Sequence, residues 1–85
     1  MRTARQNRID RALARILTDA APYLMPDAAL REEIAARVTP RPTASEVEDT
    51  LKHFDAERRL TSVPSDTGPK WKLNDAGQAW AAENL

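Results

Sequence analysis

The sequence has no cysteine, one histidine and two glycines among its 85 residues. Without cysteine the chain forms neither a disulfide framework nor a thiolate metal site, and one histidine cannot build a histidine-rich site. No apolar run approaches the roughly 18 residues that a membrane span needs, and the basic N-terminus lacks the apolar segment of a signal peptide. We therefore expect a cytoplasmic protein with no membrane contact, no metal and no cofactor.

Catalytic groupings are missing as well. There is no paired general acid and base, no nucleophile next to a base and no Gly-rich phosphate loop. An enzyme is therefore not expected. The length predicts a single domain, 1–85, with a modest core that buries roughly 60–65% of the unfolded surface. Met1 and a predicted C-terminal helix lead us to expect a complete small protein.

Charge is present but unevenly placed. The formal net charge is zero, which weighs against strong, indiscriminate binding to nucleic acid. Residues 1–15 nevertheless hold five arginines and a single aspartate, so the remaining seventy residues carry an excess of acidic groups. The N-terminal part is thus a basic arm, attached to a mildly acidic body.

The basic arm and the first helix occupy residues 1–21. Thr3 and Gln6 form a capping-box pattern, and Pro22 ends the helix after Ala21. The predicted core stripe of this helix is Ile9, Leu13, Ile16 and Leu17. A neighbouring face, about 120° around the helical wheel, carries Arg5, Arg8, Arg11 and Arg15.

A second helix is predicted over 27–38, with Asp27 as its N-cap. Its inward positions, four residues apart, are Leu30, Ile34 and Val38. Glu33 and Arg37 make a favourable i,i+4 pair on the outside. The preceding segment 23–25, which is short and apolar, is either a brief strand or a buried connection.

The third helix spans 45–58 and follows a proline-containing turn. Both Thr43 and Ser45 start a capping pattern, and the apolar stripe is Val47, Leu51 and Phe54. A hairpin is predicted over 60–73, with Gly68 at the position that needs a positive φ. Asn74 then caps a last helix, 75–83.

This order of elements resembles a winged helix-turn-helix domain of the bacterial regulator kind. The resemblance covers Leu30 to Trp80 and rests on the short turn before the third helix, on the run from that helix into 59–63, and on the segment 73–77 that follows the hairpin. It implies a mostly helical α+β fold with a three-helix core, a two-stranded wing hairpin and a short C-terminal helix. Arg59 stands where a glycine commonly closes the third helix.

The resemblance also implies a function. In that family the third helix enters the major groove of double-stranded DNA and the wing touches the backbone or minor groove. Carried over, the reading face is Ser45, Glu46, Asp49, Lys52 and His53, and the wing contacts are Ser65, Thr67, Lys70 and Lys72. We therefore predict a transcriptional regulator or accessory DNA-binding factor. A homodimer through the first helix, or through the last with Trp80 and Leu85, would suit such a role.

The charge of the third helix complicates this prediction. Residues 46–59 hold five carboxylates and three Lys or Arg side chains, whereas DNA affinity comes from cations on phosphates. If the protein binds DNA, we expect the Arg-rich first helix and the wing lysines to supply the positive charge. The simpler interpretations are a solvated helix face for the arginines, an exposed position for His53, edge protection for Lys70 and Lys72, and core packing for Trp71 and Trp80.

An alternative function uses the same fold without DNA. A winged helix can serve as a protein–protein interaction module, and fold alone does not determine function. In that case Glu46, Asp49 and Glu57 of the third helix would face a basic surface on the partner. A purely structural subunit of a larger assembly is a third possibility.

Overall fold

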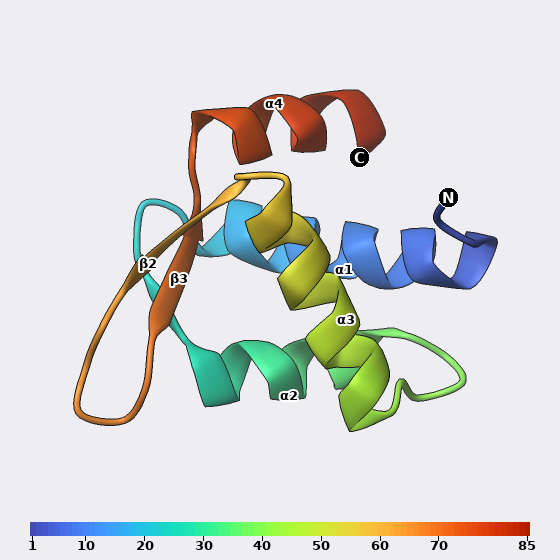
Figure 1. The fold of residues 1–85 in the computed structure, drawn as a ribbon, viewed down its shortest axis with the longest axis horizontal. Coiled ribbons are helices and arrows are strands. Elements are labelled where there is room, and N and C mark those ends of the chain that lie inside the picture. The colour runs from blue at the N-terminus through green and yellow to red at the C-terminus, as the bar shows by residue number, and fades with distance from the viewer.

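The chain folds into four helices and a three-stranded antiparallel sheet (Figure 1). The computed structural model describes all 85 residues. In order along the chain, the elements are α1 (Ala4–Ala20), β1 (Met25–Pro26), α2 (Asp27–Arg37), α3 (Ala44–Ala56), β2 (Leu60–Val63), β3 (Lys70–Leu73) and α4 (Asp75–Asn84). The predicted class, a mostly helical α+β protein, is confirmed. None of the helices combines the length and the hydropathy required to cross a membrane.

Capping boxes start the two helices that meet near the N-terminus of the chain. The Thr3 hydroxyl accepts from the Gln6 amide at 3.0 Å, and the Gln6 side chain accepts from the Thr3 amide at 2.9 Å. Thr43 and Glu46 repeat this exchange at α3, at 3.1 and 3.0 Å. Thr43 rather than Ser45 is therefore the cap, and α3 begins one residue earlier than predicted.

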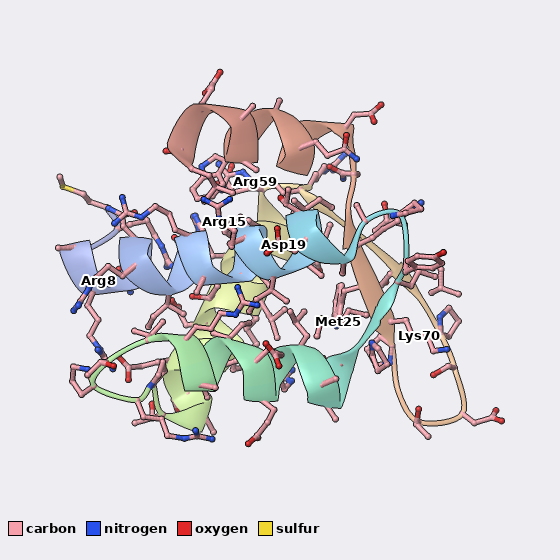
Figure 2. All side chains as sticks on the ribbon, turned by 180° about the vertical axis from the view of Figure 1, so that it is seen from behind. Arg8, Arg15, Asp19, Met25, Arg59 and Lys70 are labelled. Atoms are coloured by element: carbon pink, nitrogen blue, oxygen red, sulfur yellow. The ribbon has the colours of Figure 1, made fainter.

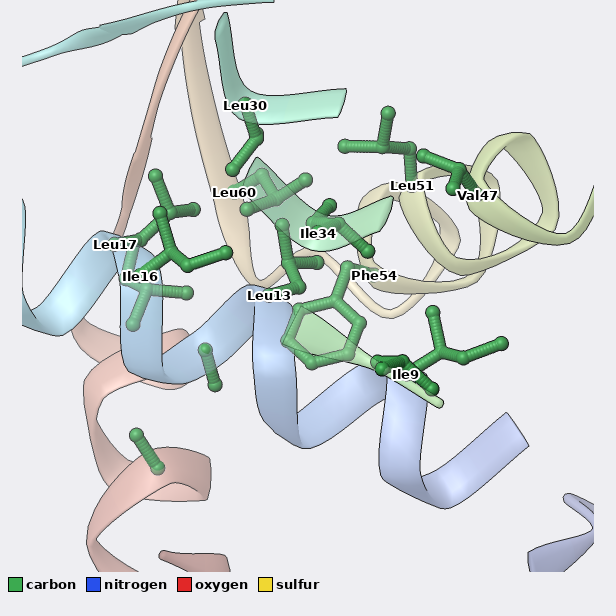
Figure 3. Close-up of a cluster of buried hydrophobic side chains, with 14 residues drawn as sticks. Ile9, Leu13, Ile16, Leu17, Leu30, Ile34, Val47, Leu51, Phe54 and Leu60 are labelled. Carbon is green, nitrogen blue, oxygen red and sulfur yellow. The ribbon is translucent and has the colours of Figure 1, made fainter. Parts of the chain in front are cut away.

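The core lies where α1 meets the other helices. In Figure 1, α3 crosses in front of α1, while α4 and α2 flank α1 on opposite sides. Phe54 of α3 is fully buried among side chains of α1 and α2 (Figure 3). Each large side chain buried in this way contributes roughly 1.5–3 kcal/mol. The stripes predicted for the first three helices point inward, with these residues buried: Ile9, Leu13, Ile16, Leu17, Leu30, Ile34, Val38, Val47 and Leu51.

The sheet has one more strand than the sequence predicts. Its order is β1-β3-β2, and the two residues of β1 pair with β3 through Met25 opposite Trp71 and Pro26 opposite Lys70. A two-residue strand is too short to show the alternation of polar and apolar residues, so the sequence could not distinguish a strand from a buried connection at this segment. Tyr23 just before it is exposed, so the segment is only partly a buried connection.

Asp27 does not cap α2 as predicted. It is the first residue of the helix, Pro26 occupies the cap position, and no side chain caps this end. The Asp27 carboxylate instead accepts the indole N–H of Trp71 at 2.9 Å and a guanidinium N–H of Arg31 at 2.9 Å. The carboxylate binds Trp71, which is distant in the sequence, instead of the helix N-terminus, and Asp27 thereby links α2 to β3.

The end of α3 also differs from the prediction. The helix stops at Ala56, and Arg58 adopts a left-handed conformation with φ of 56°. The amide of Arg59 donates to the carbonyl of Phe54 and that of Arg58 to Asp55, both at 3.0 Å, which is the Schellman arrangement. The position that usually favours glycine is therefore Arg58, one residue before the expected Arg59.

This helix end is held by the start of α4. Asn74 caps α4 as predicted, through the amide of Gly77 at 2.9 Å, and its side chain also donates to the Arg58 carbonyl at 2.7 Å. The Asn74 amide reaches the Arg59 carbonyl at 3.1 Å. A Cβ on Gly77 would lie 2.2 Å from that carbonyl, so only glycine allows the approach.

The hairpin β2–β3 extends away from the helices (Figure 1). Ser65 and Gly68 exchange backbone hydrogen bonds at 3.1 and 3.2 Å, and Gly68 has φ of 104°. The prediction that Gly68 takes the positive φ is confirmed. The register places Leu60 opposite Leu73, and both are buried.

Candidate nucleic-acid interface

The N-terminal half of α3 presents a shallow hollow that it shares with α2. Ser45 and Lys52, two of the residues predicted to read DNA, line it together with Arg31 of α2. Ala44, Glu48 and Asp49 complete the lining. Because Ala44 and Ser45 are small and exposed, the first turn of α3 is open to a partner.

Glu46 does not face this hollow as a free carboxylate. Arg5 of α1 donates to both of its oxygens, with Nε to Oε2 at 2.6 Å and Nη2 to Oε1 at 3.1 Å. The hydrogen bonds from Arg5, together with that from the Thr43 amide, lower the pKa of Glu46 to about 2. The same pair raises the pKa of Arg5. Arg5, predicted to contact phosphates, is thus bound to a predicted reading residue.

Asp49 is paired as well, through Arg2. The Arg2 guanidinium donates to Asp49 at 2.8 Å and to both oxygens of Asp10, at 3.0 and 2.7 Å. Asp10 is only 1% exposed and accepts a further hydrogen bond from the Thr50 hydroxyl at 3.0 Å. The hydrogen bond from Arg2 to Asp10 is the main cause of the raised pKa of Arg2. This network joins α1 to α3 in the interior.

The third carboxylate in this half of α3 is Glu48. It accepts a hydrogen bond from Arg31, whose guanidinium also binds Asp27 at the start of α2. Each of the three carboxylates at positions 46, 48 and 49 therefore has an arginine partner from outside α3. The acidic character that the sequence assigns to this surface is largely neutralised. Sequence reasoning missed these pairs because the partners are 17–47 residues apart.

The predicted arginine cluster is divided between two faces. Arg5 reaches α3, whereas Arg8, Arg11 and Arg15 line a hollow between α1, the end of α2 and the end of α4. Figure 2 views the molecule from this rear side, with Arg8 and Arg15 on α1 and with α3 behind that helix. Arg8 additionally donates to the Thr39 carbonyl at 3.3 Å. A duplex seated on the exposed face of α3 leaves Arg11 and Arg15 on the far side of α1.

The remaining predicted residues are dispersed. His53 is half-buried, with its ring centroid 6.2 Å from that of Phe54. Lys70 lies at the hairpin end of β3, where Figure 2 labels it, while Lys72 lines a groove between α1, β3 and α4. In the turn, the Ser65 hydroxyl donates to the Gly68 carbonyl, and Thr67 is exposed.

The two tryptophans are part of the fold rather than free anchors. Both are partly buried and pack against the core. Trp80 meets Phe54 edge-on at a centroid distance of 5.0 Å, and the Arg59 guanidinium lies 5.2 Å from the Trp80 ring and 5.3 Å from the Phe54 ring. Of the two residues predicted for a dimer contact on the last helix, only Leu85 is well exposed.

Comparison with known proteins returns no relative. No family model, no curated protein and no solved structure matches this chain. The structure also brings together no group of three or more His, Asp or Glu side chains that could hold a metal ion.

Proposed function

We propose that this chain is a winged-helix DNA-binding protein that places α3 in the major groove and β2–β3 on the adjacent backbone. The arrangement supports the proposal: three helices precede a hairpin, β3 is the central strand, and the short β1 completes the sheet. In winged-helix and other helix-turn-helix proteins the N-terminal residues of the recognition helix contact the bases. Here that turn carries small, exposed Ala44 and Ser45.

The observation that carries the proposal is the neutralisation of α3. Bare carboxylates at 46, 48 and 49 would repel phosphates, but Arg5, Arg31 and Arg2 pair with them. The same arginines surround the first half of the helix, so their positive charge offsets the repulsion between these carboxylates and the phosphates of a bound duplex. Lys52 forms no ion pair and adds an exposed cation on the side of α3 that would face the DNA major groove.

The test is duplex binding as a function of salt, by fluorescence anisotropy on random-sequence DNA. Three neutralised phosphates give a log–log slope of about −2.7, at roughly −0.9 each. Lys52→Glu is expected to weaken binding and flatten the slope, and Asp49→Lys to strengthen binding. Arg11→Glu makes the same charge change as Lys52→Glu on the far side of α1, so we expect a much smaller loss.

Two results would overturn the proposal. A larger loss for Arg11→Glu than for Lys52→Glu would place the DNA on the rear face, and Asp49→Lys without effect would remove α3 from the interface. A protein that recognises only a rare sequence could fail to bind random DNA measurably, so a pool of randomised duplexes is also screened for binders at low salt. Failure to select any duplex there would exclude DNA as the ligand.

The second candidate is a protein-interaction module that uses α3. It is favoured by Asp55 and Glu57, which are exposed and form no ion pair, and by Asp49, whose side chain is 51% exposed despite its pairing. These groups suit a basic partner surface. Charge reversal separates the two functions, because Asp49→Lys strengthens duplex binding in the first and abolishes partner binding in the second.

A further inference from the structure

A groove runs between α1, β3 and α4, separate from the hollow at α3, and of the α3 and hairpin residues predicted to contact DNA it contains only Lys72. Its volume is about 600 Å³. The floor is made by Leu17, Leu73 and Ala81, all less than 9% exposed, and Leu85 forms an exposed part of the wall. From α4, the groove is lined by Gln78, Ala81 and Ala82.

The charged side chains of this groove are all of one sign. Arg15 and Lys72 line it, and neither makes an ion pair within the chain. Arg15 and Leu85 are shared with the rear hollow, so the apolar groove continues into the surface of Arg8 and Arg11. No Asp or Glu lines either hollow. The acidic groups of the protein are elsewhere, largely paired with other arginines.

We propose that this groove binds an acidic amphipathic helix of a partner protein. The apolar side chains of that helix pack on Leu17, Leu73 and Ala81, and its carboxylates face Arg15 and Lys72. An apolar channel between two helices is a shape that takes a third helix through anchors spaced three and four residues apart. The unpaired cations then determine which charge the helix must carry, since complementary charge at the rim gives specificity.

Two other occupants fit less well. Nucleic acid would gain from the cations, but the apolar floor offers nothing to phosphates or sugars. A second copy of this chain related by a two-fold axis would bring Arg15, Lys72 and the neighbouring arginines against their own equivalents, because such an interface uses the same patch twice. Both alternatives remain distinguishable by experiment. The proposal is also independent of whether α3 binds DNA.

The experiment is an NMR titration of the ¹⁵N-labelled full chain with a synthetic 16-residue peptide, which has leucines at spacings of three and four and glutamates between them. The changes in amide chemical shift should cluster at residues 15–22, at 72–73 and at 78–85. Arg15→Glu and Lys72→Glu should each weaken binding about tenfold, and Leu85→Ser should also weaken it. Arg58→Glu makes the same charge change at an exposed position outside both hollows and should leave the affinity unchanged.

A peptide with lysine in place of glutamate provides the matched comparison. The proposal is overturned if that peptide binds equally well, or if the acidic peptide at about 1 mM moves none of the named resonances. Duplex DNA that causes the same shifts and is weakened by Arg15→Glu would make this a nucleic-acid site instead. A dimer in analytical ultracentrifugation that Leu85→Ser dissociates would assign the groove to a second copy.

Discussion

Arg5 and Glu46, which are forty-one residues apart in the sequence, form a two-point ion pair between the first turn of α1 and the first turn of α3. Arg5 also donates to the carbonyl of Pro40 at 3.1 Å, so it holds the turn between α2 and α3 as well. One side chain thereby positions the beginning of the helix that we propose enters DNA.

This pair predicts a specific dependence of stability on pH. The pKa of Glu46 is lowered from 4.5 to about 2, so its charged form is favoured by folding. The stabilisation is fully present above pH 4.5 and is lost as the pH falls toward 2. Glu46→Gln keeps the capping box, because Gln serves at that position, and removes only the charge. Urea unfolding should show the variant less stable at pH 6, with the difference shrinking below pH 4.5. A difference that did not change with pH would contradict this explanation.

The buried carboxylate of Asp10 should be important for stability. Asp10→Ala leaves the Arg2 guanidinium and the Thr50 hydroxyl without their interior acceptor. We expect a loss of about 2–3 kcal/mol, somewhat less than for a fully buried pair because Arg2 remains partly in contact with water. Asp19→Ala removes an exposed carboxylate from the same helix and should cost less than about 0.5 kcal/mol. Equal losses in chemical unfolding would mean that the network does not stabilise the fold.

Replacing Arg58 by glycine should stabilise the protein. Arg58 has φ of 56°, a conformation that costs a non-glycine residue roughly 1–2 kcal/mol and glycine almost nothing. Arg58→Gly should therefore raise the free energy of unfolding by about 1 kcal/mol. Arg59→Gly is the adjacent comparison and should be destabilising, since it removes the guanidinium that lies over Phe54 and Trp80. Thermal unfolding distinguishes the two, and a stabilising Arg59→Gly would contradict the assignment of the Schellman motif.

Gly77 should tolerate no side chain. A Cβ there would lie 2.2 Å from the Arg59 carbonyl and 2.9 Å from the side chain of Leu73, so Gly77→Ala forces α4 away from the end of α3. We expect a loss of about 2 kcal/mol or more. Gly68→Ala meets no atom within 4 Å and suffers only the strain of its positive φ, about 1 kcal/mol. If the two variants were equally stable, the close approach at Gly77 would not be a constraint.

Local patterns were sufficient for most of the fold. Periodicity located the four helices within one or two residues at each end, since spacings of three and four appear directly in the stripes of α1, α2 and α3. Capping chemistry placed Thr3 and Asn74 correctly, and turn composition placed Gly68. The larger misses were β1, which is too short to show a period, and Asp27, whose carboxylate binds Trp71 of a distant strand instead of capping α2.

The candidate sites depended on longer-range information. The arginines of α1 share a broad face on a helical wheel, but packing turns Arg5 toward α3 and leaves Arg11 and Arg15 behind α1. Likewise, a count of charges makes α3 acidic, whereas its first three carboxylates form ion pairs with Arg5 of α1, Arg31 of α2 and Arg2 just before α1.

By itself, then, the sequence determined where the helices and the hairpin form, because these follow from interactions among residues at most a few positions apart. Only the tertiary structure decided which charges remain free and which face each cation occupies. An ion pair such as Arg2 with Asp49 joins residues forty-seven positions apart. Its formation depends on how α1 packs across α3, and no local pattern encodes that geometry.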